Sequence, residues 1–203
     1  EQTIASISKK QSASIGAPLW CPSLPSQLTR DDLDQLHSSE RGIHIGLIDG
    51  IESGAHRCLT WQHGNIMMSG SGSSASKLAL LVRSCATTLS DSLGFPLCGV
   101  SIDSGTPHSA ATSPDYLIRD IVDFGVLCED LYHRAPCVVW LEDIEGTLHM
   151  LEECLGVLRA HDLWGQFTRS CDGVNIVLIA SDVSGRFTSR TLFGSYEHIW
   201  YEI

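Results

Sequence analysis

Small residues gather between two apolar stretches at residues 64–81 and could bind a phosphate group. An apolar run ending at Ser69 is followed by a segment of glycines and serines, and then by a helix-forming run from about Ser76. Glycine permits the backbone angles of a tight loop, and the N–H groups at a helix N-terminus attract anions. The candidate phosphate-binding or nucleotide-binding residues are Gly70, Gly72, Ser73, Ser74, Ser76 and Lys77.

The segment departs from the Walker A motif of P-loop proteins, G-x-x-x-x-G-K-[ST], at three positions. Counted from Gly70, Ala75 replaces the second glycine and Ser76 replaces the lysine. Lys77 stands where the hydroxyl residue should hold Mg²⁺, and a shift of one residue rotates its side chain by about 100° around a helix. Three interpretations therefore stay open: a weak nucleotide or anion site, a catalytic site with unusual residues, and a strand-to-helix turn without a ligand.

Two acidic residues follow a second apolar run, Cys137–Leu141. P-loop enzymes hold Mg²⁺ and polarise water at the end of such a strand. Asp143 is the better candidate for the carboxylate beside the metal, and Glu142 is the alternative. Because the loop lacks the hydroxyl that would complete the site, we expect no bound metal and a catalytic role that is weak or lost.

Ser181 is the third candidate, at the end of the apolar run 175–180. In P-loop motors the corresponding strand ends in a polar residue near the γ-phosphate. A serine that caps a turn would have the same sequence signature, so both interpretations stand.

Strand-like and helix-like runs alternate through most of the chain, which predicts an α/β fold with a mostly parallel central sheet covered by helices on both faces. The predicted strands are 43–49 and 58–61 (a hairpin), 66–69, 96–102, 137–141, 175–180 and 198–203. The predicted helices are 29–36, 76–89, 114–133, 147–160 and 189–193. In the helix 147–160 we expect four leucines to face the core: Leu148, Leu151, Leu155 and Leu158.

The charge and the cysteines exclude several classes of function. The 203 residues carry a formal net charge of −11, and duplex binding needs clustered Lys and Arg, so we do not expect a nucleic-acid partner. None of the eight cysteines forms a C-x-x-C pair, which favours reduced, buried thiols over a zinc site or a disulfide framework. No stretch approaches 18 consecutive apolar residues, so we expect no membrane insertion by this piece.

In this order the segments resemble FtsK/SpoIIIE-type P-loop ATPase domains, most closely the later, degenerate domains of the type VII secretion motor (the EccC/EssC family). The likeness covers roughly residues 19–203, and residues 1–18 read as a linker or arm. Its segments are Leu19–Pro25, Ile45–Asp49, Arg57 with Thr60-Trp61, Gly64–Gly70, Ser101–Asp103 and Gly173–Ser181.

The resemblance implies a RecA/FtsK-like P-loop fold and a domain that binds nucleotide weakly or not at all, with ATP and Mg²⁺ as weak ligands at most. It implies a role in assembly, in regulation or in recognition of the C-terminal signal of an export substrate. Its partners would be the other ATPase domains of the same polypeptide, in the cytoplasmic part of a membrane-anchored secretion protein. The alternatives are an active ATP-hydrolysing motor domain and an FtsK-type DNA translocase domain, and the net charge disfavours the second.

Overall fold

The computed structural model describes residues 42–50, 55–71, 75–103, 114–182 and 196–202. The chain divides into two compact units, Glu1–Gln62 and His63–Ile203. In the described part of the first unit, β1 (Ile43–Gly50) pairs antiparallel with β2 (Ala55–Trp61), which confirms the predicted hairpin. The predicted arm 1–18 and the predicted helices 29–36 and 189–193 lie outside the described residues.

The second unit contains a parallel sheet of six strands in the order β5-β4-β6-β7-β3-β8. The strands are β3 (Asn65–Ser71), β4 (Leu97–Ile102), β5 (Tyr116–Ile118), β6 (Cys137–Leu141), β7 (Ile176–Asp182) and β8 (Tyr196–Glu202). Every neighbouring pair in this sheet is parallel. The prediction of a mostly parallel central sheet is therefore confirmed.

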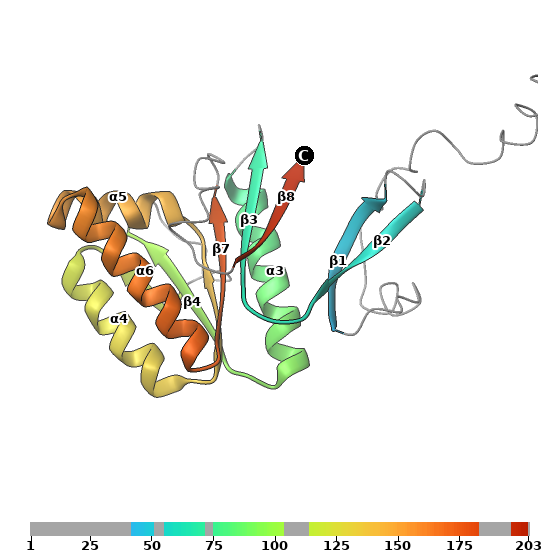
Figure 1. The fold of residues 1–203 in the computed structure, drawn as a ribbon, viewed down its shortest axis with the longest axis horizontal. Coiled ribbons are helices and arrows are strands. Elements are labelled where there is room, and N and C mark those ends of the chain that lie inside the picture. Colours follow the sequence, from blue (N-terminus) through green and yellow to red (C-terminus); the bar gives the residue numbers. More distant parts are fainter. Residues whose placement is uncertain (1–41, 51–54, 72–74, 104–113, 183–195, 203) are drawn as a thin grey trace, which may run out of the picture. The chain divides into compact units, whose positions relative to one another are not determined.

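Helices cover both faces of this sheet (Figure 1). The helix α3 (Ala75–Leu93) packs on one face, and α4 (Ile121–Arg134), α5 (Ile144–Leu155) and α6 (Val157–Gly173) lie on the other. All residues of β6 and β7 are buried, as expected for strands covered on both faces. The continuous apolar runs that predicted these strands are a consequence of this double burial.

The predicted helix 114–133 is wrong at its beginning. Tyr116–Ile118 form the short strand β5, in which Leu117 pairs with Ser101 of β4. The helix α4 begins only at Ile121, because the Asp120 carboxylate accepts hydrogen bonds from the backbone N–H groups of the first turn, at 2.8 and 3.0 Å. The apolar spacing of residues 117–131 therefore combines a strand and a helix.

The predicted helix 147–160 is two helices, and the second was missed. Gly156 has φ 78°, a left-handed conformation that ends α5 after Leu155 and lets α6 begin at Val157. The apolar pattern starts again in α6, so Leu158 is 87% exposed. The prediction that Leu158 faces the core is therefore wrong. Leu148 and Leu151 are buried, as predicted.

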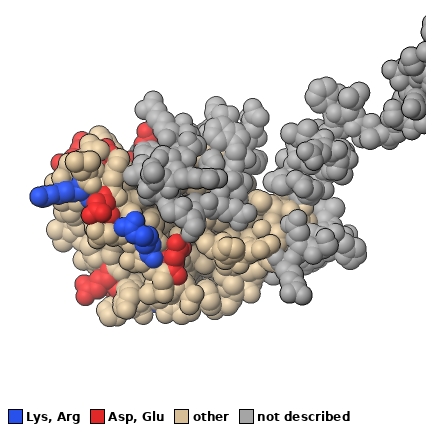
Figure 2. All heavy atoms as spheres, viewed as in Figure 1, with Lys and Arg blue, Asp and Glu red and all other residues tan. Residues whose placement is uncertain are grey.

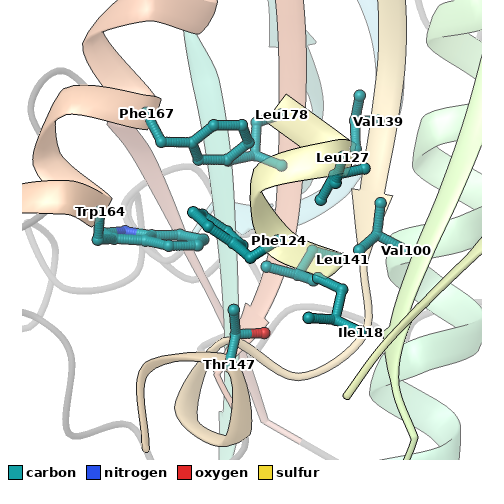
Figure 3. Close-up of a pocket in the computed structure, with 10 residues that line it drawn as sticks. All are labelled: Val100, Ile118, Phe124, Leu127, Val139, Leu141, Thr147, Trp164, Phe167 and Leu178. Atoms are coloured by element: carbon teal, nitrogen blue, oxygen red, sulfur yellow. The ribbon is translucent and has the colours of Figure 1, made fainter. Parts of the chain in front are cut away.

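Three aromatic rings join α4 and α6 in the core. Phe124 lies 6.3 Å from Trp164 and 5.4 Å from Phe167, measured between ring centroids, and the last two lie 5.5 Å apart. Figure 3 shows these rings beside Leu141 and Leu178 of the sheet. The cavity among the ten labelled side chains measures about 10 Å³, which is room for one water molecule at most, so this core has no space for a larger ligand.

Candidate functional site

The strands β3, β7 and β6, which carry or precede the described candidate residues, end side by side at the carboxyl edge of the sheet. The register pairs Ser69 of β3 with Asp182 of β7, and Leu141 of β6 with Ala180 of β7. Segments that follow neighbouring parallel strands meet at this edge, which is the usual ligand-binding edge of open α/β sheets. The structure thus places the ends of β3 and β6 at the same edge.

The strand, small-residue segment and helix follow one another as predicted, but the strand is longer. The strand β3 ends at Ser71, two residues beyond the predicted end, and therefore includes Gly70. The backbone of Gly70 pairs with Tyr201 of β8. Gly72, Ser73 and Ser74 lie outside the described residues. Ser76 and Lys77 belong to the first turn of α3, and their side chains also lie outside the described part. A phosphate contact by this segment stays a prediction.

Ser181 and Glu142 are brought together. Ser181 is 1% exposed, and its hydroxyl group donates a hydrogen bond to the backbone carbonyl of Glu142. This contact joins the end of β7 to the residue that follows β6. The hydroxyl therefore links two neighbouring strands of the sheet, and a role near a phosphate stays a prediction.

The Glu142 carboxylate is engaged through both of its oxygens. Arg83 of α3 forms an ion pair with Oε1 through Nη2, and the Ser101 hydroxyl donates to Oε2 at 3.2 Å. The Arg83 and Glu142 side chains are only 19% and 17% exposed. The negative charge at the end of β6 is therefore compensated by a cation that the chain itself supplies.

Trp140 forms a platform under this ion pair. The guanidinium carbon of Arg83 lies 4.4 Å from the centroid of the Trp140 ring, within range of a cation–π interaction. On the neighbouring strand, Gly99 leaves room for the indole, since a Cβ at that position would overlap the ring. The arginine, the indole and the carboxylate thus form one packed group, the Arg83–Glu142 cluster (Arg83, Ser101, Trp140 and Glu142).

Asp143 caps helix α5. Its Oδ1 accepts a hydrogen bond from the Gly146 N–H at 2.8 Å, and its backbone carbonyl accepts one from the Thr147 hydroxyl at 2.7 Å. Gly146 also allows the close approach, because a Cβ there would lie 2.5 Å from Asp143 Oδ2. The carboxylate that the sequence favoured as a metal ligand is committed, through Oδ1, to the first turn of a helix.

Sequence reasoning missed the contribution of Arg83, Ser101 and Trp140 to this edge. Arg83 is one of two basic residues in α3, and it follows Val82, which is fully buried. An arginine beside the apolar face of a helix was the available signal. The sequence does not indicate that its partner lies 59 residues further along the chain.

Burial raises the pKa of several thiols in the second unit. The pKa of Cys98 is raised to about 12 by burial and by the nearby Asp115 carboxylate, and that of Cys128 is raised to about 11 by burial. Burial also raises the pKa of Cys137 and of Cys171. These thiols therefore carry their protons at neutral pH, as expected for cysteines that act as small apolar residues.

The surface has a groove of about 430 Å³ between α4 and α6. Leu131, Tyr132, Leu163, Phe167, Val174 and Ile176 contribute its apolar part, and Glu129 is its charged lining residue. On the face shown in Figure 2, the described basic side chains stand among acidic ones and form no continuous basic area. Within the described ranges, no cluster of His, Cys, Asp and Glu has the geometry of a metal site, and no helix has the length and apolar content to cross a bilayer.

Comparison with protein-family models and with curated proteins finds no match for this chain.

Proposed function

We propose that this chain is a degenerate P-loop ATPase domain of FtsK/SpoIIIE type, and that it serves in a type VII secretion-like motor without hydrolysing ATP itself. The order of strand, small-residue segment and helix over residues 65–93 supports the P-loop likeness. So does the position of β7 between β3 and β6, since the strand that precedes the small-residue segment and the strand that precedes Glu142 end at one edge. The Ser181–Glu142 contact lies at that edge.

The observation that carries the non-catalytic part is the engagement of the Glu142 carboxylate by Arg83 and Ser101. A general base or a metal ligand needs an oxygen that is open toward water or toward the ion. Asp143 also has a structural task, because its Oδ1 caps the first turn of α5. The residues that replace the Walker A glycine, lysine and hydroxyl residue (Ala75, Ser76 and Lys77) also argue against ATP hydrolysis.

The proposed role is therefore one of assembly, regulation or recognition of an export-substrate signal, with other ATPase domains of the same polypeptide as partners. Exposed apolar side chains on α4 support a role in binding other protein domains, since Val122, Val126 and Tyr132 are 68%, 50% and 63% exposed. The net charge of −11 and the interspersed charges of Figure 2 disfavour the DNA translocase alternative. The proposal places the domain in the cytoplasmic part of a membrane-anchored protein.

ATP titration and turnover on the 203-residue chain test the proposal, with Glu142→Gln as the matched variant. We expect no Mg²⁺-dependent turnover above that of Glu142→Gln, and weak or undetectable heat of ATP binding. Turnover by the unaltered chain that Glu142→Gln abolishes would establish the active-motor alternative. Salt-sensitive binding of duplex DNA near physiological ionic strength would favour the translocase alternative.

A further inference from the structure

We infer that Arg83 is an internal counter-cation that takes the place of a divalent metal ion at the end of β6. The inference uses the proposed P-loop likeness only to say where such an ion would lie. It concerns the cation requirement of the folded chain, which is measurable without nucleotide.

The residues present do not fit a bound Mg²⁺. This ion requires near-octahedral oxygen coordination at about 2.0–2.1 Å and is commonly held by one or two carboxylates. At this edge one oxygen of Glu142 is paired with a guanidinium and the other accepts from the Ser101 hydroxyl. A metal ion beside Glu142 would have to displace a positively charged group that is already paired with the same carboxylate.

Two of the nearby oxygen-bearing groups also have partners within the chain. The Ser181 hydroxyl donates to the Glu142 backbone carbonyl, and Asp143 Oδ1 accepts from the Gly146 N–H. Among the residues that the structure describes, no group of three or more His, Cys, Asp or Glu side chains is arranged to hold a metal ion. Arg83 therefore balances a charge that the chain would otherwise leave half-buried and uncompensated.

Packing fixes the guanidinium in this position. It stacks on the Trp140 ring, and that ring occupies the space left by the absent side chain of Gly99. The Arg83 side chain is only 19% exposed. A guanidinium that moved away from the carboxylate would lose both the stack on Trp140 and the ion pair. The guanidinium is therefore held beside the carboxylate by packing as well as by charge, and we expect the folded state not to depend on Mg²⁺.

The experiment compares the unaltered chain with Arg83→Met, which removes the charge and keeps an unbranched apolar stem. Thermal unfolding is followed in EDTA and in about 10 mM MgCl₂, because an ion that binds only the folded state raises the Tm. Mn²⁺ binding is measured by electron paramagnetic resonance. The unaltered chain should show the same Tm in both buffers and no Mn²⁺ binding.

Arg83→Met should unfold at a Tm lower by about 5 °C or more in EDTA and recover part of that loss in MgCl₂. It should also bind Mn²⁺ at concentrations at which the unaltered chain shows no binding. Arg119→Met is the matched control, because Arg119 forms an exposed ion pair with Asp103 at 2.9 Å. It should leave both the Tm and Mn²⁺ binding unchanged. Adding Glu142→Gln to Arg83→Met should remove the response to Mg²⁺, since the carboxylate that Arg83 neutralises is then absent.

The inference is overturned if Arg83→Met behaves like the unaltered chain in every buffer. It is also overturned if the unaltered chain binds Mn²⁺ through Glu142, shown by loss of that binding in Glu142→Gln. Should Arg83→Met fail to fold, Arg83→Lys keeps the charge and must still unfold at the same Tm with and without Mg²⁺. None of these measurements uses ATP. A result that overturns the inference about Arg83 is therefore distinguishable from one that overturns the proposed function.

Discussion

Substitution of Asn65 tests how β3, the strand that precedes the small-residue segment, is held in the sheet. Asn65 is 1% exposed at the start of β3, and its Oδ1 accepts a hydrogen bond from the Leu178 N–H at 2.8 Å. Its Nδ2 donates to Asp172 Oδ1 at 2.9 Å. One amide group thus ties β3 both to β7 and to the end of α6, through partners more than a hundred residues away.

Asn65→Asp keeps the acceptor for Leu178 and replaces the donor by a carboxylate oxygen that faces Asp172. The lost hydrogen bond to a charged group costs about 1.5–3 kcal/mol. Two unit charges 2.9 Å apart repel by about 1.4 kcal/mol at the dielectric constant of water and by about 6 kcal/mol at an effective constant of 20. Uptake of one proton by the carboxyl pair limits this repulsion, so we expect a loss of about 2–5 kcal/mol in the free energy of unfolding near pH 7.5.

Urea denaturation followed by circular dichroism measures this loss, and two comparisons make it specific. First, the loss should shrink as the pH falls from 7.5 toward 5, because a shared proton removes the repulsion in the folded state. Second, Asn65→Asp combined with Asp172→Asn exchanges the donor and the acceptor and should recover at least half of the stability. The reasoning is refuted if Asn65→Asp costs less than about 1 kcal/mol, or if the exchanged pair is no more stable than the single variant.

Three further predictions follow from contacts in the same unit. Asp143→Ala should lower the free energy of unfolding by about 0.5–2 kcal/mol, whereas Asp143→Asn should be nearly neutral because asparagine also caps helices; equal losses in urea denaturation would contradict the cap. Gly99→Ala should cost about 1–3 kcal/mol and change the Trp140 fluorescence, because the added methyl group overlaps the indole; a spectrum and stability like those of the unaltered chain would contradict this packing. Thermal unfolding should show full stability below pH 9 and a loss of stability as the pH rises from 9 toward 11. The reason is that thiols ionise near pH 9.0 in the unfolded chain, whereas in the folded chain the pKa of Cys98 is raised to about 12 and that of Cys128 to about 11. The slope is up to about 1.4 kcal/mol per pH unit for each such thiol, and Cys98→Ala should reduce it; a slope unchanged by that variant would exclude Cys98 as a source.

The central strands could be predicted because their signal is local. Cys137–Leu141 is apolar at every position, and the structure buries every one of these residues in β6. A strand covered on both faces needs such a run, and few other short elements do. The hairpin Ile43–Trp61 was predictable for a related reason, since its two strands are neighbours along the chain.

The division of the helices was harder to predict. Leu155 and Leu158 continue the spacing of Leu148 and Leu151, but Gly156 turns the chain and α6 begins with a new phase. Glycine occurs inside helices as well as at their ends, so its left-handed φ is decided by how α5 and α6 pack. The short strand β5 was missed in a similar way, because three residues carry too little pattern to outweigh the helix that follows.

For the candidate site, the sequence alone determined which residue types end the strands: Glu142 and Asp143 after β6, and Ser181 in β7. The tertiary structure decided what those groups contact. Arg83 reaches Glu142 across 59 positions of sequence, and Ser181 reaches it across 39. Periodicity and motif spacing report only which face of an element is buried, whereas a hydrogen bond depends on elements that meet in space. That is why the sequence could place two carboxylates at the edge of the sheet, and only the fold could show that one is paired with an arginine and the other caps a helix.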